Sequence, residues 1–178
     1  IMRDDYGLNI WANGDFIIEK GKICLNTPSK PALQDMIEKI REDGIRGPIL
    51  LRFPHLIAKQ ISELYTNFKA AMSEFDYGGN FCAVYPLKVN QYPGFVGNLV
   101  EVGKKYGYGL EAGSKAELLL AMAYNELASP ITVNGFKDKE LINLGFIAAE
   151  MGHNITIPIE GLGELETINK TKKNRFKP

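Results

Sequence analysis

Lys88 closes a short apolar run and is the residue whose type and position could most directly do chemistry. The run Phe81–Lys88 is rich in aromatic and branched residues and follows a Gly-Gly-Asn turn signal at 78–80, which predicts a buried strand. Parallel α/β folds collect active-site groups at the carboxyl ends of their strands. Partial burial there favours a neutral amine, which can attack a carbonyl carbon to form a Schiff base. The alternative is a lysine that only extends into water.

Three more polar residues follow predicted strands in the same way. Glu111, Asn134 and Glu160 each stand where a later apolar run ends. In a barrel of parallel strands these side chains and Lys88 would point toward one mouth. Any one of them alone is typical of a solvated loop, but four at corresponding positions favour a shared site.

Strand patterns alternate with helical patterns from about Gly47 onward, so the sequence predicts an α/β fold with right-handed crossovers and a parallel sheet. Units of similar length favour the first half of a (β/α)₈ TIM-type barrel over an open sheet. Ser114 is the predicted N-cap of one helix, with Glu117 in the capping-box position. The expected strands are 48–53, 81–88, 107–111, 130–133 and 154–160, and the expected helices cover 55–75, 95–102, 114–122, 141–147 and 162–168.

We expect three parts along the chain. Residues 1–30 form a β-rich segment of a separate β-domain, with short antiparallel strands at 8–12, 15–18 and 22–25. Residues 31–78 hold an entry helix that starts at Pro31, a strand and a second helix. Residues 79–178 hold the first four βα units of the barrel. The chain starts at Ile1 and stops just after a helical pattern, so we expect a fragment.

Composition excludes several classes of protein. Lys+Arg and Asp+Glu both number 21, so nothing favours nucleic acid or an anionic membrane as a partner, and no apolar run could span a bilayer. Cys24 and Cys82 lack metal or disulfide spacing, which indicates a reducing cytoplasm, and we expect Cys82 to be a core residue. The glycines at 107 and 109 follow a helical segment, unlike those of a dinucleotide fingerprint.

Several segments resemble the biosynthetic arginine decarboxylases, pyridoxal-phosphate enzymes of the alanine-racemase-like barrel family. They are YPLKVNQ at 85–91, GLEAGSKAEL at 109–118, VNGFKDKE at 133–140, GHNITIPIE at 152–160 and, upstream, GLNIWANG at 7–14. The similarity covers nearly the whole chain in the expected order. The lysine motif alone would indicate only the wider family.

The resemblance implies an oligomeric carboxy-lyase, a dimer or tetramer, that converts arginine to agmatine and carbon dioxide for polyamine synthesis. Lys88 matches the lysine that binds pyridoxal phosphate and acts in catalysis, and Glu111 matches a second catalytic position. Ala83 and Glu160 match positions that contact the cofactor. Magnesium is also described for the family, although the sequence presents no ligand set for it. The family's phosphate cradle belongs beyond Pro178, so we expect these residues alone to be inactive.

Other functions stay open at this stage. A diaminopimelate or ornithine decarboxylase shares the chemistry, but those enzymes resemble a version with a shorter segment before Lys88. A non-catalytic pyridoxal-phosphate carrier would lack the β-domain expected from residues 1–30. The simplest rival is a βα-repeat protein without a cofactor. Nothing in these residues selects the substrate.

Overall fold

The computed structural model describes residues 7–175. The chain divides into two compact units, and the boundary in the sequence lies between Leu56 and Ile57. The first six residues of the predicted β-rich segment, and the last three residues of the chain, lie outside the described part.

The first unit is built around a two-stranded antiparallel hairpin. Strand β1 (Phe16–Glu19) pairs with β2 (Lys22–Leu25), and Glu19 lies opposite Lys22. The two loop residues, Lys20 and Gly21, have φ of 50° and 80°, as the tightest hairpin turn requires. The strand expected at 8–12 is wrong: Leu8–Trp11 is a helical turn, α1. Its backbone hydrogen bonds are local, since Ala12 N donates to Leu8 O at 2.9 Å.

A ten-residue helix, α2 (Leu33–Glu42), follows the hairpin. Ala32 is its N-cap, so Pro31 precedes the helix and is not its first residue as predicted. The strand expected at 48–53 does not form, because a strand needs a neighbour for its backbone groups and this segment pairs with none of the described residues. Leu50 in this segment is 72% exposed.

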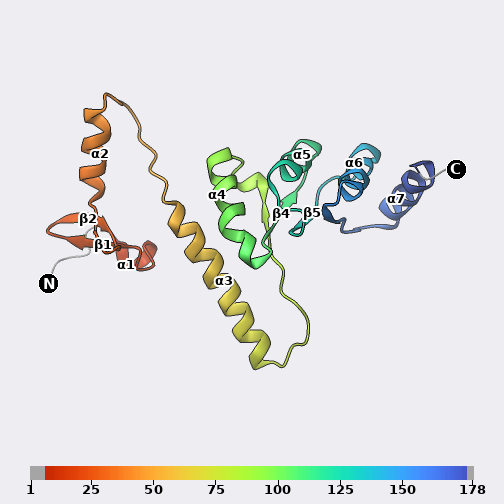
Figure 1. The fold of residues 1–178 in the computed structure, drawn as a ribbon, viewed down its shortest axis with the longest axis horizontal. Helices are drawn as coiled ribbons and strands as arrows, with labels where there is room; N and C mark the ends of the chain where they lie inside the picture. Colours follow the sequence, from red (N-terminus) through yellow and green to blue (C-terminus); the bar gives the residue numbers. More distant parts are fainter. Residues whose placement is uncertain (1–6, 176–178) are drawn as a thin grey trace. The chain divides into compact units, whose positions relative to one another are not determined.

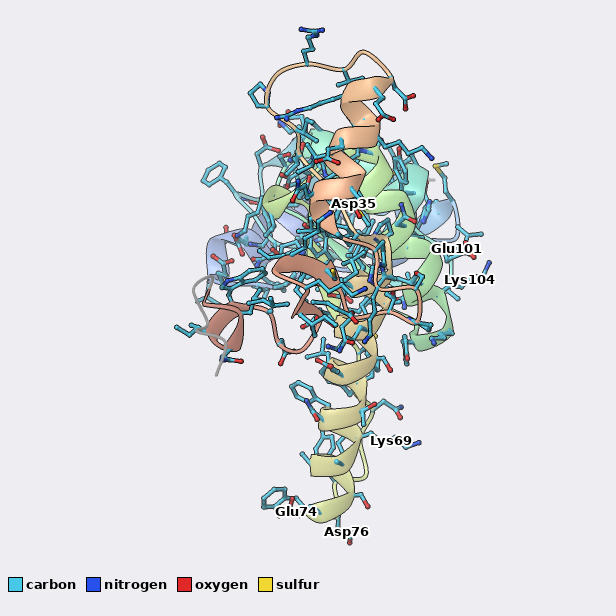
Figure 2. The ribbon with its side chains drawn as sticks, turned by 90° about the vertical axis from the view of Figure 1, so that its left-hand side faces the viewer. Asp35, Lys69, Glu74, Asp76, Glu101 and Lys104 are labelled. Carbon is cyan, nitrogen blue, oxygen red and sulfur yellow. The ribbon has the colours of Figure 1, made fainter. Side chains whose placement is uncertain are left out.

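The long helix α3 (Pro54–Glu74) confirms the predicted helix at 55–75. One side of it packs on aromatic rings: Tyr65 stacks on Tyr106 with ring centroids 4.8 Å apart, and Phe68 stacks on Phe81 at 3.8 Å. Figure 2 shows Glu74 at the end of this helix and Asp76 in the turn that follows it.

Four parallel strands form the sheet of the second unit, and their spatial order is their chain order (Figure 1). They are β3 (Val84–Pro86), β4 (Gly109–Ala112), β5 (Pro130–Val133) and β6 (Asn154–Thr156). Helices α4 (Pro93–Gly103), α5 (Lys115–Tyr124), α6 (Lys139–Glu150) and α7 (Leu162–Arg175) follow one strand each. The prediction of an α/β fold with a parallel sheet, and of a separate small sheet, is confirmed.

The core lies between the helices and one face of this sheet. Leu110 and Ile131 are completely buried and lie opposite each other on β4 and β5. Around them pack the buried residues Val96, Leu99 and Val100 of α4, Leu118 and Ala121 of α5, and Leu141 of α6. Because side chains alternate along a strand, Glu111 and Thr132, which are also opposite each other, lie on the other face.

The first strand of the sheet is shorter than predicted. Only Val84–Pro86 pairs with β4, and the expected strand ran from Phe81 to Lys88. Cys82, expected in the core, is exposed, with its thiol 3.8 Å from Gly107 O. The ladder reaches back only to Ala83, whose carbonyl accepts from Gly109 N at 2.9 Å, so the residues before it have no strand to pair with.

Candidate active site at the carboxyl ends of the strands

One row of side chains crosses the sheet on the face opposite the core. The strand register places Pro86 beside Glu111, Glu111 beside Thr132, and Thr132 beside Thr156. The row therefore contains one carboxyl group and two hydroxyl groups. It lies close to the carboxyl ends of all four strands, where the four predicted polar residues also stand.

Lys88 follows β3 directly, in a single 3₁₀ turn formed by Leu87–Val89. Leu87 is fully buried and fixes this turn to the core, while Lys88, the next residue, is exposed. The sequence left two possibilities open for this lysine, partial burial and extension into water, and the described residues match the second. The side chain is accessible at the end of a strand whose position is fixed by Leu87.

Glu111 and Asn134 are brought together by the pairing of β4 and β5. Asn134 Nδ2 donates a hydrogen bond of 3.3 Å to Glu111 Oε2. Asn134 follows β5 immediately, and its backbone N donates to Ala112 O at 2.9 Å, which extends the ladder by one residue. The amide orients the carboxylate at the carboxyl ends of β4 and β5, and this hydrogen bond was not predicted from the sequence.

Ala83 is not brought to this row. It directly precedes β3, and its backbone N donates to the hydroxyl of Tyr65 on α3 at 3.3 Å. By alternation Ala83 shares the face of Tyr85, which packs against the buried core. The structure thus places Ala83 apart from Glu111, on the helix side of the strand.

Glu160 is held by a buried lysine that the sequence reasoning did not single out. The side chain of Lys137 is 0% exposed, and its ammonium lies 3.2 Å from Glu160 Oε1 and 3.0 Å from Glu164 Oε1. It also donates to Gly135 O at 3.0 Å. Burial acts to lower the pKa of Lys137, but the hydrogen bonds to Glu164 and Glu160 outweigh it and hold that pKa above its ordinary value.

The first turns of the helices carry further ties between neighbouring loops. Ser114 caps α5 as predicted, accepting from Glu117 N at 3.2 Å. The Glu117 carboxylate accepts from Gly113 N at 2.7 Å and from Nε2 of Gln91, in the loop after β3, at 2.8 Å. These contacts join the loop after β3 to the start of α5.

Two glycines allow the loops after β4 and β5 to touch. A Cβ atom on Gly135 would lie 2.0 Å from Gly113 O, closer than any real contact. The backbones therefore meet where no side chain fits, which brings the two loops together directly beside Asn134.

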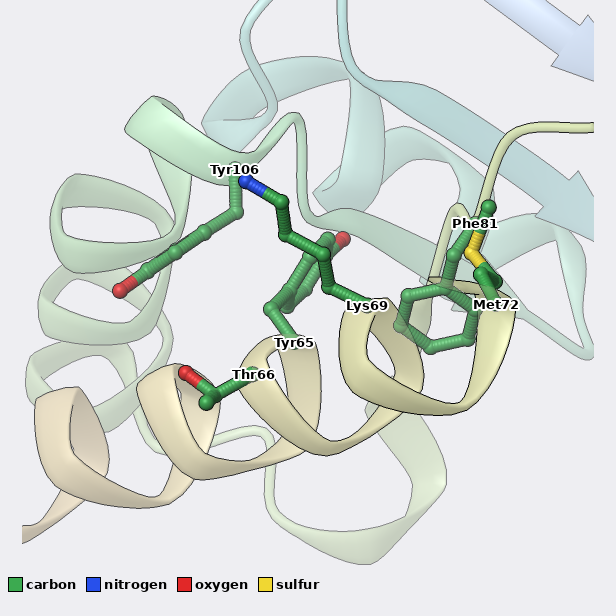
Figure 3. A pocket seen from close by; sticks show the side chains of 6 residues that line it. All are labelled: Tyr65, Thr66, Lys69, Met72, Phe81 and Tyr106. Atoms are coloured by element: carbon green, nitrogen blue, oxygen red, sulfur yellow. The ribbon is translucent and has the colours of Figure 1, made fainter. Parts of the chain in front are cut away.

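A pocket with partly polar lining lies elsewhere. It has a volume of about 420 Å³ and is lined by side chains of α3 together with Phe81 and Tyr106 (Figure 3). Phe81 precedes β3 and Tyr106 precedes β4, so this pocket lies at the amino ends of the strands. Lys88 stands at the other end of the strands, the carboxyl end.

The described part of the chain offers no group of three or more His, Cys, Asp or Glu side chains that could hold a metal ion. No helix between residues 7 and 175 is both long and apolar enough to cross a membrane.

The comparisons with known proteins agree with the motifs. No family model matches the chain. A curated biosynthetic arginine decarboxylase from Xanthomonas axonopodis pv. citri is 37% identical over 170 residues, which cover 93% of this chain and 27% of the relative. Another from Vibrio cholerae is 32% identical over 182 residues, covering 97% and 28%. The resemblance indicated by the sequence motifs is confirmed.

Two solved structures are also similar. The biosynthetic arginine decarboxylase SpeA from Campylobacter jejuni is 68% identical, with a TM-score of 0.93 over 98% of this chain and 29% of its own. A diaminopimelate decarboxylase from M. jannaschi is 24% identical, with a TM-score of 0.64 over 92% of this chain and 34% of its own, and shares the fold. The chain thus spans a little over a quarter of the arginine decarboxylases that it matches.

Proposed function

We propose that this chain supplies the amino-terminal part of the catalytic barrel of a biosynthetic arginine decarboxylase, which releases carbon dioxide from arginine to give agmatine for polyamine synthesis. The observation that carries the proposal is the 68% identity to the Campylobacter jejuni enzyme over 98% of the chain. The sequence motifs of this chain stand at the carboxyl ends of four successive strands. The proposed protein is a longer chain than these 178 residues.

The sheet topology supports a barrel over an open sheet. In doubly wound sheets the strand order reverses and helices cover both faces, whereas here the order is sequential and the described core lies on one face only. The outer edges of β3 and β6 have no strand partner among the residues described. Closure into a barrel would pair both edges and enclose the Glu111 row as its interior.

Lys88 is the residue we propose to hold pyridoxal phosphate. Pyridoxal phosphate, when bound, supplies an electron sink for the carbon that loses carbon dioxide. Its attachment needs an amine that is accessible and can lose a proton. Lys88 is exposed, whereas Lys137 is buried between two carboxylates that keep it charged. Lys88 and Lys137 are thus distinguished by their surroundings.

Glu111 is the second residue to which we assign a role. Asn134 orients its carboxylate on the row that would become the barrel interior. A carboxylate in this position can accept a proton from an amine or hold a cationic group by a charge-assisted hydrogen bond. We propose that it orients the Lys88 ammonium or the amino group of the substrate. Glu160 is the proposed cofactor contact on the loop after β6.

The residues present fit one end of the cofactor. They provide an amine, a carboxylate and hydroxyls, but the described loops contain no cradle that we can assign to its phosphate. The proposal therefore assigns the phosphate to residues outside this chain. Magnesium has no support here and is left out of the proposed mechanism. A homo-oligomer of the full-length enzyme is proposed from the resemblance alone.

The test uses the full-length enzyme. The holoenzyme is reduced with borohydride, digested and analysed by mass spectrometry, and carbon dioxide release is measured from arginine, ornithine, lysine and diaminopimelate. We expect a pyridoxyl group on Lys88, release from arginine, and loss of both in Lys88→Arg. Lys139→Arg, a change at an exposed lysine on α6, is the matched control and should retain activity.

Each alternative gives a different result. Release from ornithine or diaminopimelate in place of arginine would identify the related decarboxylases. A modified Lys88 without release from any amino acid would identify a pyridoxal-phosphate carrier. An unmodified Lys88 would exclude every function that depends on this cofactor.

A further inference from the structure

We infer that Lys137 is a positioning residue: it fixes the loops after β5 and β6 so that Asn134 and Glu160 are held at the same mouth. The inference deepens the proposed function and rests on it. It is carried by the placement of one buried ammonium between two loops that each present a polar residue at the strand ends.

The ammonium of Lys137 is fully satisfied. Lysine has three N–H donors, and the structure provides three acceptors: Gly135 O at 3.0 Å, Glu160 Oε1 at 3.2 Å and Glu164 Oε1 at 3.0 Å. The Lys137 side chain is 0% exposed, so the ammonium itself is shielded from bulk water. A buried charge with this set of partners has one favourable position.

Glu160 is fixed at two points by the same cluster. Its side chain pairs with Lys137, and its backbone N donates to Glu164 Oε2 at 2.8 Å. Glu164 thus uses one oxygen for Lys137 and the other for the Glu160 backbone. The pKa of Glu164 is lowered, first by the hydrogen bond from Glu160 N and then by that from Lys137, so its carboxylate stays charged. Glu160 itself has 67% of its side chain exposed, free to meet a ligand.

The other end of the cluster reaches Glu111. Lys137 donates to Gly135 O, and Gly135 directly follows Asn134, whose amide binds Glu111 Oε2. One connected path therefore runs from Glu111 through the 134–137 loop and Lys137 to Glu160. It links the ends of β4, β5 and β6, which are also joined by their backbone ladders.

A second tie along the same edge provides a matched comparison. Lys115 Nζ lies 2.6 Å from Asp138 Oδ2 and also joins two successive units. It differs in two respects: its side chain is 48% exposed, and it contacts neither Glu160 nor Asn134. Loss of this tie should therefore leave the mouth in place.

The experiment compares Lys137→Met, Lys137→Arg and Lys115→Met in the full-length holoenzyme. We measure the dissociation constant of pyridoxal phosphate from its absorbance, and kcat and KM for arginine. Misplacement of polar groups at a site by about 1 Å can cost about a hundredfold, so we expect Lys137→Met to weaken cofactor binding or lower kcat by about ten- to a hundredfold. Lys137→Arg should recover part of the loss, and Lys115→Met should change either value by less than about twofold.

Glu164→Gln is the second variant, in case Lys137→Met does not fold. This change keeps the size of the side chain but leaves one uncharged oxygen, which cannot accept from both Lys137 and Glu160 N. We therefore expect weaker cofactor binding or a lower kcat, as for Lys137→Met. Values equal to wild type in Glu164→Gln, or equal losses in Lys137→Met and Lys115→Met, would overturn the inference. A wild-type enzyme that does not decarboxylate arginine would overturn the proposed function instead, and cofactor binding would still test Lys137.

Discussion

Asn134 Nδ2 lies 3.3 Å from Glu111 Oε2 and joins side chains that are 23 residues apart in the chain. The contact exists because β4 and β5 are parallel neighbours whose carboxyl ends coincide. It gives Glu111 a fixed orientation on the face of the sheet that carries no core. Asn134 is therefore a partner that any role of Glu111 depends on.

Replacing Asn134 should impair the full-length enzyme in a graded way. Asn134→Ala removes one hydrogen bond, worth about 0.5–1.5 kcal/mol, so kcat/KM for arginine should fall by up to about tenfold. Asn134→Asp places a second carboxylate against Glu111 and should be worse. Asn169→Ala, at an exposed position on α7, is the control. A higher kcat/KM for Asn134→Asp than for Asn134→Ala in steady-state kinetics would contradict this role.

The close contact between Gly135 and Gly113 should make Gly135 intolerant of a side chain. Gly135→Ala puts a Cβ atom 2.0 Å from a backbone oxygen, and relief of that clash should cost about 1–3 kcal/mol or more. Gly97→Ala is the matched control, because its Cβ would lie 3.8 Å from Tyr124 inside helix α4 and should stabilise the protein by about 0.5–1 kcal/mol. Urea unfolding measures the change in the free energy of unfolding for both variants. Equal changes in Gly135→Ala and Gly97→Ala would refute the explanation.

Leu110 should be among the most sensitive positions of the core. It is 0% exposed at the centre of the sheet, so Leu110→Ala should lower the free energy of unfolding by about 2–5 kcal/mol. Leu119 on α5 is 55% exposed, and Leu119→Ala should stay within about 0.5 kcal/mol. The two free energies of unfolding are compared from the midpoints of denaturant unfolding, provided that the dependence of the free energy on denaturant concentration is unchanged. A cost at Leu119 as large as that at Leu110 would mean that the helix face is assigned incorrectly.

Asp138 should make stability depend on pH in acid. The hydrogen bond from Lys115, and then that from Leu141 N, hold the pKa of Asp138 below its ordinary value of 3.8. A lowered pKa means that the folded state favours the charged form, so the contribution is present above the ordinary pKa and is lost as pH falls through the lowered one. Asp138→Asn keeps an acceptor for Leu141 N but loses the charge.

The difference in stability between wild type and Asp138→Asn should thus be present at pH 7 and shrink as the solution is acidified. Unfolding by urea at a series of pH values measures it. Asp76→Asn, in the exposed turn after α3, is the control and should give a smaller change. A difference that grows on acidification would reverse the sign argued here.

The βα units could be predicted because each relies on local signals. Ser114 caps α5 by accepting from Glu117 N, as its spacing predicts, and Asp138 caps α6 in the same way by accepting from Leu141 N. The sequence failed where pairing decides the structure. The segment 48–53 has the composition of a strand but no neighbour among the described residues, and Leu8–Trp11 closes local bonds as a helical turn instead of joining the hairpin.

The site was predicted in part for the same reason. Strand ends can be read from apolar runs, so Glu111 and Asn134 could be placed together before the structure was known. Lys137 could not, because its burial depends on two glutamates more than twenty residues later. A lysine immediately before the N-cap Asp138 is the only local signal for it. The side of the strand on which Ala83 lies follows from the strand register, which composition does not reveal, and its expected contact with the cofactor stays a prediction.

The chain-order arrangement of β3, β4, β5 and β6 has a consequence for synthesis on the ribosome. Each strand pairs with the one completed just before it, so every new unit has its docking partner already present. We expect ordered structure to accumulate step by step as the polypeptide emerges, so that the nascent chain gains protease resistance with each completed βα unit. Pulse proteolysis of stalled nascent chains would reveal a single late transition if that growth does not occur.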